Sequence, residues 1–225
     1  MVNSNLKIYD SLLQFTLFQG MSHNDLMEVV THTKIGFHKI PSGKKLFSQG
    51  ENCHQLTFLL SGTIDTIQQA DNKAYDVTER MSAPFLIGTE HLFGINQQYP
   101  CTYSAATPLH LITIDKQEVI LLLETQLVFR LNMLNLIATT TQRLLRQPWR
   151  SAPHSLRDSI VRFFFAHCHY PAGHKTFHIR MQQLADILHY SRLDVSRALN
   201  IMQADGLLSL HRSRIEIPML ERLLM

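Results

Sequence analysis

Residues 181–218 constrain the fold of this chain more than any other part of its sequence. The stretches "MQQLADILHY" (181–190) and "RLDVSRALNIMQADG" (192–206) carry apolar residues at three- and four-residue steps, which is typical of amphipathic helices. A turn at Tyr190-Ser191 separates them, and "LLSLHRSRIEIP" (207–218) has the pattern of a β-hairpin. The sequence therefore predicts two short helices and a hairpin in immediate succession.

The residues before this segment extend the pattern. "HSLRDSIVRFFFAHC" (154–168) predicts a helix, and "KTFHIR" (175–180) predicts a short strand. Helix, short turn, helix and then hairpin is the order of a winged helix-turn-helix. Seven apolar side chains are expected to bury the two central helices: Leu184, Ala185, Ile187 and Leu188 in the first, and Val195, Leu199 and Met202 in the second.

The second of these helices keeps a polar face. Arginine in the N-terminal half of such a helix can enter the major groove of DNA and donate to guanine O6 and N7. For Arg192 an alternative stays open, a surface salt bridge with Asp194 or Asp186, which would contribute little energy. The residues predicted to lie on the polar face are Arg192, Ser196, Arg197 and Asn200.

Charge is divided unevenly along the chain. Residues 1–127 hold eight Lys and Arg against twelve Asp and Glu, a net −4, whereas residues 128–225 hold thirteen against six, a net +7. Twelve of those thirteen basic residues are arginine, which suits bidentate contact with phosphates and base edges. The balance favours a polyanionic partner for the C-terminal part, with a solvated basic face as the alternative.

The N-terminal half has the character of a β-rich barrel or sandwich. Seven of the nine glycines lie in the first 94 residues, which indicates short strands joined by tight turns. The apolar runs "QLTFLLSGTIDTI" (55–67) and "LHLITI" (109–114) are short and partly β-branched or aromatic. A helix precedes them, because Ser22 followed by Asp25 resembles an N-cap with an acidic first turn.

From Lys116 the pattern changes to one long helix, predicted over residues 116–147, which contain neither Gly nor Pro. Pro148 and Pro153 interrupt it, and the domain boundary is placed there. An apolar stripe along the helix predicts either burial against the β domain or contact with the same helix of a second subunit. The stripe assigned to the dimer interface is Phe129, Met133, Leu136, Ile137, Thr140 and Leu144.

Composition excludes several classes of protein. No run of about 18 apolar residues exists and the N-terminus lacks the regions of a signal peptide, so a cytoplasmic location without membrane contact is expected. Three cysteines at wide spacing indicate reduced structural thiols rather than a disulfide framework or a thiolate metal site. No nucleophile elbow, P-loop, H-E-x-x-H or dinucleotide fingerprint is present, so no enzyme activity is predicted.

The order and spacing of several short motifs carry a resemblance to a known family. The motifs are "LFQGMSHNDLMEV" (17–29), "PSGKKLFSQGE" (41–51), "FLLSGTI" (58–64), "LIGTEHLF" (86–93), "LADILHYSRLDVSRALNIMQADGLL" (184–208) and "RSRIEIP" (212–218). The chain resembles the cyclic AMP receptor protein/FNR superfamily of bacterial transcription regulators.

This resemblance implies an α+β fold and a homodimer that binds a palindromic operator. The implied parts are a β-roll effector domain with a cyclic-nucleotide-binding-like jelly roll (1–115), a dimerisation helix (116–147), a hinge linker (148–154) and a winged helix-turn-helix (155–225).

The resemblance also implies roles in DNA binding. Ser196-Arg197 matches a base-reading pair of the family, so Arg197 is expected to contact guanine, and Arg192 a base or a phosphate. Leu193 stands where many members have glutamate, and it is expected to touch a thymine methyl group. In the hairpin, Arg212 and Arg214 are expected to contact the phosphate backbone.

The region aligned with the family's effector pocket departs from the cyclic-nucleotide pattern. Gly88-Thr89, with Glu90 displaced by one, stands for the Gly-Glu that holds the ribose, and Tyr99-Pro100 stands for the Arg-Ser that holds the cyclic phosphate. A buried phosphate would therefore lose its charge-assisted bonds, which argues against cyclic AMP. The residues assigned to an effector pocket are Gly88, Thr89, Glu90, Tyr99, Leu144 and Leu145.

Other effectors of the family need particular ligands, and the effector stays unidentified. An iron–sulfur cluster of the FNR type needs four cysteine thiolates, and the chain has three. Haem stays open because the chain has thirteen histidines. A redox switch at Cys101 or Cys53 would need a lowered thiol pKa. A further candidate is a zinc site in the group His167, Cys168, His169, His174 and His178.

The sequence thus predicts a regulator that binds specific double-stranded DNA as a homodimer under control of an effector other than cyclic AMP. RNA polymerase is a further candidate partner. The alternative is a cyclic-nucleotide-fold sensor that signals through protein partners without specific DNA binding, and the arginine-rich C-terminal block argues against it.

Overall fold

The computed structural model of the chain describes residues 8–146 and 152–224. The chain divides into two compact units that do not follow its order. Of the described residues, the first comprises 8–64, 82–100 and 104–146, and the second comprises 65–81, 101–103 and 152–224.

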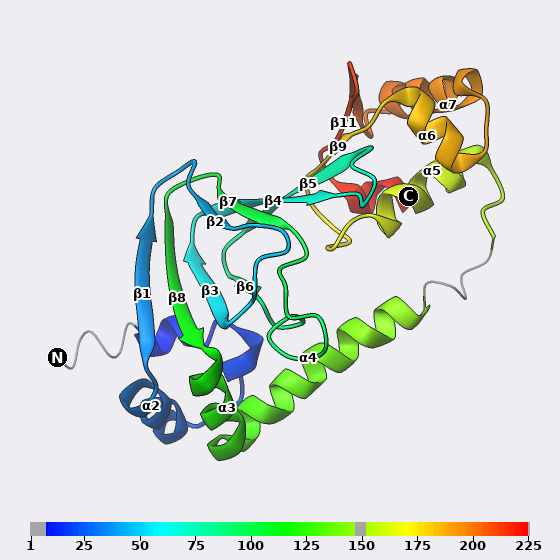
Figure 1. Cartoon of the computed structure of the whole chain (residues 1–225). Helices are drawn as coiled ribbons and strands as arrows, with labels where there is room; N and C mark the ends of the chain where they lie inside the picture. The colour runs from blue at the N-terminus through cyan, green and yellow to red at the C-terminus, as the bar shows by residue number, and fades with distance from the viewer. Residues whose placement is uncertain (1–7, 147–151, 225) are drawn as a thin grey trace. The chain divides into compact units, whose positions relative to one another are not determined.

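A four-stranded antiparallel sheet organises the first unit. Its order is β1 (Ile35–Ile40), β8 (Leu109–Asp115), β3 (Gln55–Ser61) and β6 (Phe85–Ile87), and Figure 1 shows β1, β8 and β3 running side by side. Phe58 of β3 lies opposite Ile112 of β8, and both side chains are fully buried. The runs that predicted strands from their β-branched and aromatic residues form β3, β8 and, in the hairpin described below, β4.

The predicted N-cap at Ser22 is confirmed. Before β1 lie η1 (Thr16–Phe18) and α2 (His23–His32). The Asp25 backbone N–H donates to Ser22 Oγ at 3.2 Å, and the Ser22 backbone N–H donates to Asp25 Oδ2 at 3.3 Å. This reciprocal pair is a capping box, which fixes the start of α2.

The prediction of one helix over residues 116–147 is wrong. The structure has α3 (Lys116–Thr125) and α4 (Leu127–Arg146), with a bend of 114° between them, and Gln147 lies outside the described residues. Gln126 at the break is buried, and its Nε2 donates to Glu28 Oε2 of α2 at 3.1 Å. The sequence did not signal the break, because no Gly or Pro stands there and the contact that accompanies the break is tertiary.

Among the described residues no single helix is long and apolar enough to span a bilayer, and only the bent α3–α4 pair passes by length and composition.

Part of the stripe assigned to a dimer interface is buried inside the protomer, so the prediction is wrong for Phe129 and Met133. Their side chains are 0% and 3% exposed, and the Phe129 ring lies 5.4 Å from that of Phe18 in η1. Asn132 Nδ2 donates to the backbone carbonyls of Leu17 and Gln19, which fixes this face of α4 toward η1. Half-buried positions follow at Leu136, Ile137 and Thr140, and Leu144 is exposed.

The second unit contains the predicted helix-turn-helix and hairpin. In chain order it has α5 (Leu156–Ala166), β9 (Lys175–His178), α6 (Met181–Leu188), α7 (Arg192–Ala204), β10 (Ser209–His211), β11 (Arg214–Ile217) and η3 (Leu220–Leu224), so the predicted order of elements is confirmed. The Asp158 backbone N–H donates to Ser155 Oγ at 3.1 Å and starts α5. Of the linker predicted at 148–154, residues 148–151 lie outside the described residues, and Pro153 lies in irregular backbone.

The predicted core of the two central helices is confirmed with one exception. Leu184, Ala185, Val195, Leu199 and Met202 are at most 1% exposed, and Leu188 packs against the same core. Ile187, predicted to be buried, is instead 40% exposed. The buried stripe of this eight-residue helix is therefore narrower than the apolar pattern predicted.

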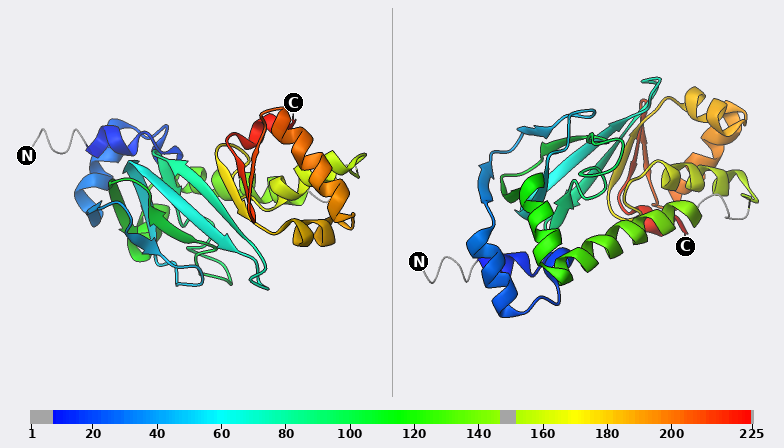
Figure 2. Two further views of the ribbon diagram at one scale, coloured as in Figure 1. Left: turned by 90° about the horizontal axis from the view of Figure 1, so that it is seen from above. Right: turned by 60° about the horizontal axis from the view of Figure 1, so that its bottom comes forward.

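The second unit also includes a hairpin from the middle of the chain. Its strands β4 (Thr63–Gln69) and β5 (Asp76–Ser82) are drawn in cyan in Figures 1 and 2. Strand β5 pairs antiparallel with β9, which on its other edge pairs with β11. The strands thus follow the order β10-β11-β9-β5-β4, and the sheet continues beyond β4 with β7 (Thr102–Ala105).

Candidate nucleic-acid interface

The turn between α6 and α7 is closed by three successive residues. His189 adopts the left-handed conformation (φ 58°, ψ 39°), and the Tyr190 backbone N–H donates to the Ala185 carbonyl at 3.1 Å. Ser191 then caps α7, since its Oγ accepts from the Asp194 backbone N–H at 3.1 Å and donates to Asp194 Oδ2 at 2.6 Å. The sequence predicted the turn one residue late, because a left-handed histidine carries no strong sequence signal.

The opposite side of α7 from its buried residues faces solvent. Arg192, Leu193, Arg197 and Asn200 are exposed, and Ser196 is half-buried, so the five contact residues predicted on this helix lie on its accessible part. The helix itself is fixed from below, since Val195 and Leu199 are fully buried in the core. The face is therefore presented by a rigid element rather than by a loop.

The surface ion pair considered for Arg192 forms at a different arginine. Arg197 Nη1 lies 3.9 Å from Asp194 Oδ1, with the Arg197 side chain 69% exposed. The other candidate partner, Asp186, accepts from Gln182 Nε2 at 2.8 Å. An exposed pair at this distance contributes little, so Arg197 can leave Asp194 for a stronger acceptor.

The hairpin after α7 forms the wing. His211 and Arg214 are paired across its turn, where Ser213 has a positive φ of 57°. Gln203 Oε1 of α7 accepts from the Leu210 backbone N–H at 2.7 Å and joins the wing to α7. Arg212 is exposed, and Arg214 Nη2 lies 3.2 Å from Glu216 Oε1.

A solvent-open hollow of about 590 Å³ lies beside the wing, and we call it the arginine hollow. Three arginines line it, which makes it suited to an anion such as a phosphate. Arg180, which precedes α6, was not identified from the sequence, because it stood at the end of a predicted strand rather than in a motif. The lining residues are Ala74, His178, Arg180, Gln183, His211, Arg212, Ser213 and Arg214.

Some of the residues assigned to an effector pocket meet around Cys53 in the first unit. The Cys53 thiol donates to the Gly88 carbonyl at 3.8 Å and shares a hydrogen bond with the Tyr99 side chain. Gly88 has φ +101°, and a Cβ there would lie 2.8 Å from the Gln55 carbonyl oxygen, so only glycine fits.

Of the neighbouring assigned residues, Thr89 and Tyr99 are buried and Glu90 is half-buried. Thr89 Oγ1 donates to Glu90 Oε2 at 2.8 Å, and the Tyr99 ring stacks on Phe47 at 4.3 Å between centroids. Leu144 and Leu145, by contrast, are exposed on α4. The structure thus brings Gly88, Thr89, Glu90 and Tyr99 into one region and leaves the role of the two leucines a prediction.

None of the three thiols has the lowered pKa that a redox switch needs. Burial raises the pKa of Cys53, and burial raises the pKa of Cys101 to about 11. Burial and the nearby Glu79 also raise the pKa of Cys168. The lowered thiol pKa that the redox hypothesis required at Cys53 or Cys101 is therefore contradicted.

The histidine-rich group considered for zinc has other partners. Within residues 8–146 and 152–224, no three His, Cys, Asp or Glu side chains are grouped so that they could hold a metal ion. His167 Nδ1 lies 2.8 Å from the Phe163 carbonyl oxygen, and His178 Nδ1 lies 2.7 Å from Asp76 Oδ1.

Comparison with known families divides the sequence into two matches. Residues 37–126 match the cyclic nucleotide-binding domain, and residues 159–225 match the Crp-like helix-turn-helix domain. A comparison with curated protein sequences found no match.

Solved structures share the fold at low sequence identity. The catabolite activator protein of Thermus thermophilus has a TM-score of 0.50 and 19% identity, covering 93% of this chain and 96% of that one. The sensor domain of the transcriptional regulator DNR from Pseudomonas aeruginosa has a TM-score of 0.54 and 19% identity, covering 68% and 99%. A cyclic nucleotide-binding domain from Methylobacillus flagellatus has a TM-score of 0.52 and 15% identity, covering 66% and 88%.

Proposed function

The chain belongs to the cyclic AMP receptor protein/FNR superfamily, and on that premise we propose that it is a transcription regulator that binds a palindromic DNA operator as a homodimer. The observation that carries this proposal is the exposed face of α7, which holds two arginines beside a wing that holds two more. Twofold symmetry of the protein would place two such helices about 34 Å apart, one turn of DNA.

In this proposal α7 reads base edges in the major groove. Arg197 contacts guanine, because its guanidinium is exposed and held only by a weak pair with Asp194. Arg192 contacts a base or a phosphate, Leu193 touches a thymine methyl group, and Ser196 and Asn200 supply shorter polar contacts. The wing then positions the helix, with Arg212 and Arg214 on the phosphate backbone.

The proposed dimer uses the exposed face of α4 rather than the buried one. Leu127, Leu131, Leu134 and Leu145 are between 49% and 66% exposed. The steps from 127 to 131 and 134 are four and three residues, and position 145 falls on the same heptad seam, which is the spacing of a two-helix coiled coil. A second copy of α4 is the occupant that such a seam fits, with Leu144 beside it.

The effector is proposed to be something other than cyclic AMP, because no arginine stands at the position aligned with the cyclic phosphate. Haem remains open as the effector. RNA polymerase is a further proposed partner, and the proposed location of the protein is the cytoplasm. The division into residues 1–115, 116–147, 148–154 and 155–225 remains a prediction. A sensor that signals only through proteins is the second candidate, and no described feature favours it over DNA binding.

The test is selection of DNA in vitro from random duplexes, using wild type, Arg197→Ala and Arg222→Ala. Arg222 is an exposed arginine of η3 and serves as the matched control. A twofold-symmetric motif from wild type and Arg222→Ala, which loses preference at one guanine with Arg197→Ala, is the expected result. The same motif at the same strength from all three would remove Arg197 from base reading, and loss of every motif would contradict specific binding.

A further inference from the structure

The β4–β5 hairpin lies within the sheet of the unit that contains the helix-turn-helix, with β9 on one side and β7 on the other. Strand β9 has β11 on one edge and β5 on the other, with Asp76, Val77, Thr78 and Glu79 of β5 opposite His178, Phe177, Thr176 and Lys175. The hairpin residues fall within the match to the cyclic nucleotide-binding domain, although they form one compact unit with the helix-turn-helix. A segment of the cyclic nucleotide-binding match thus lies in the same sheet as β9 and β11 of the helix-turn-helix match.

Apolar contacts hold the hairpin against the core of this unit. Val77 is 3% exposed and belongs to the same buried cluster as Phe177 and Phe164. Tyr75 lies 5.8 Å from the ring of Phe163. Release of the hairpin would expose this surface, so the docked and released states differ by a defined apolar contact.

A buried ion pair lies in the same joint. Lys175 Nζ is 2.7 Å from Glu79 Oε2, with the two side chains 0% and 3% exposed. The Glu79 carboxylate also accepts from the backbone N–H groups of His169 at 2.6 Å and Tyr170 at 3.1 Å. Desolvation offsets much of the attraction in such a pair, so it fixes the register of the joint more than it adds net stability.

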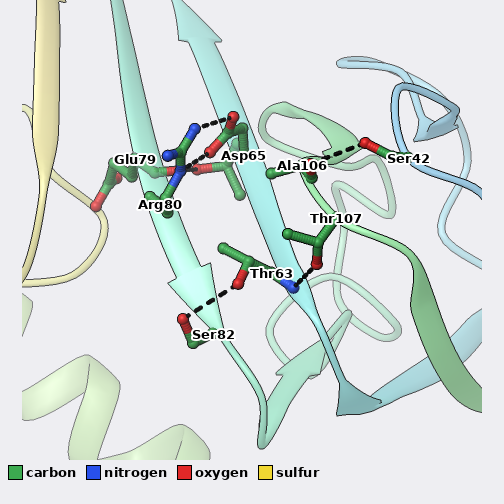
Figure 3. Close-up of polar contacts among 9 residues, drawn as sticks. Ser42, Thr63, Asp65, Glu79, Arg80, Ser82, Ala106 and Thr107 are labelled. Carbon is green, nitrogen blue, oxygen red and sulfur yellow. Dashed lines mark hydrogen bonds and ion pairs between the residues drawn. The ribbon is translucent and has the colours of Figure 1, made fainter.

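The hairpin is braced internally, which favours movement as one piece. Arg80 donates to both oxygens of Asp65, at 2.7 and 2.9 Å, and joins β5 to β4. Figure 3 shows this pair, with Glu79 directed instead toward the yellow segment that contains β9.

The end of the hairpin reaches the proposed phosphate contacts. Ala74 lines the arginine hollow together with Arg180, Arg212 and Arg214. Asp76, two residues on, holds the ring of His178, another lining residue, at 2.7 Å. The docked hairpin therefore supplies part of the wall of the hollow and places a carboxylate beside its lining residue His178.

We propose that the pairing of the β4–β5 hairpin with β9 can separate and that it limits DNA binding: the docked hairpin holds the Asp76 carboxylate beside the arginine hollow, where it opposes a phosphate, and release of the hairpin from β9 raises affinity for DNA. The proposal rests on the proposed function, since it assigns phosphate contact to the hollow. The proposal connects a hairpin of the cyclic nucleotide-binding match directly to the proposed phosphate contacts in the arginine hollow.

The test compares two β-branched residues of the same hairpin in the full chain. Val77→Ser removes the buried contact, and Ile67→Ser is the control, because Ile67 is 38% exposed on β4. Neither substitution changes the charge or any residue after position 150. A third variant, Thr78→Cys with Thr176→Cys, places cysteines at directly opposed positions and locks the joint when oxidised.

Two measurements are made on each variant. Hydrogen exchange followed by mass spectrometry reports protection of residues 76–79 and 175–178, and fluorescence anisotropy reports affinity for a labelled duplex of random sequence. Val77→Ser is expected to lose protection there, keep it in α5–α7 and bind the duplex roughly tenfold more tightly, whereas Ile67→Ser matches wild type. The oxidised cysteine pair is expected to bind more weakly than its reduced form.

The outcomes separate this proposal from the proposed function. Lost protection without tighter binding overturns the gating role, and absent protection in wild type overturns docking itself. A selected palindrome with either result leaves the proposed function standing. Failure of wild type and Val77→Ser to bind any duplex overturns both proposals.

Discussion

Lys175 and Glu79 face each other across β9 and β5, with Nζ and Oε2 2.7 Å apart and both side chains buried. Neither residue belongs to a recognisable motif, and 95 positions separate them in the chain. Among the ion pairs of the described residues, this pair has the least exposed side chains. The stability of its unit therefore depends on whether one charge or both charges are removed.

Removal of one charge should be more harmful than removal of both. Lys175→Met leaves the Glu79 carboxylate buried without its cation, and we expect a loss of about 3–5 kcal/mol in the free energy of unfolding. Lys175→Met combined with Glu79→Gln removes both charges and keeps an oxygen for one of the two backbone N–H groups of His169 and Tyr170, so it should regain part of that loss. Urea denaturation of the full chain measures both, and equal losses would show that charge is not the cause.

Arg197→Lys should relax recognition at one base pair. Lysine keeps the positive charge but cannot donate two parallel hydrogen bonds to guanine O6 and N7. We expect a loss of about 1–3 kcal/mol on the selected operator and a small change on random DNA. Competition binding with operators substituted at each position provides the measurement, and a uniform loss at all positions would assign Arg197 to the backbone instead.

Arg212→Ala and Arg214→Ala should weaken binding without changing its preferred sequence. Each lost phosphate contact reduces the slope of log affinity against log salt by about 0.9. Arg222→Ala is the control at an exposed site in η3. Titrations at several salt concentrations decide the point, and unchanged slopes would remove the wing from the phosphate contacts.

Leu131→Asp should dissociate the proposed homodimer. The side chain is 49% exposed on α4, so the substitution spares the protomer core and places a charge on the heptad seam. Leu121→Asp on α3, where leucine is 51% exposed, is the matched control. Sedimentation velocity should show a monomer for Leu131→Asp alone, and an unchanged dimer would contradict the seam.

Alkaline pH should destabilise the chain in part through Cys101. Burial raises the pKa of this thiol from 9 to about 11, so the folded state holds its proton where the unfolded state releases it. Its stabilising contribution is complete below pH 9 and decreases as pH rises from 9 to 11. Unfolding of wild type and Cys101→Ala at intervals across this range should show a steeper decrease for wild type, and parallel curves would contradict the assignment.

Local patterns predicted the second half of the fold well. The helix-turn-helix and wing followed from apolar periodicity and from the turn predicted at Tyr190-Ser191, because these elements are set by residues close in sequence. The break at Gln126 and the burial of Phe129 did not follow, since both depend on contacts with η1 and α2 more than 90 positions away. Arg180 was missed because it stood at the end of a predicted strand rather than in a motif, and the docked hairpin was missed because strand pairing across the chain leaves no local signature.

The two-sided pairing of β9 has a consequence for any attempt to study the helix-turn-helix alone. A fragment that begins after the linker would keep β11 on one side of β9 and lose β5 from the other, which exposes a row of unpaired backbone groups beside a bare apolar surface. Such an unpaired edge of β9 favours strand exchange with a second fragment. Self-association of the isolated piece would then reflect the missing hairpin rather than the dimer of the whole protein.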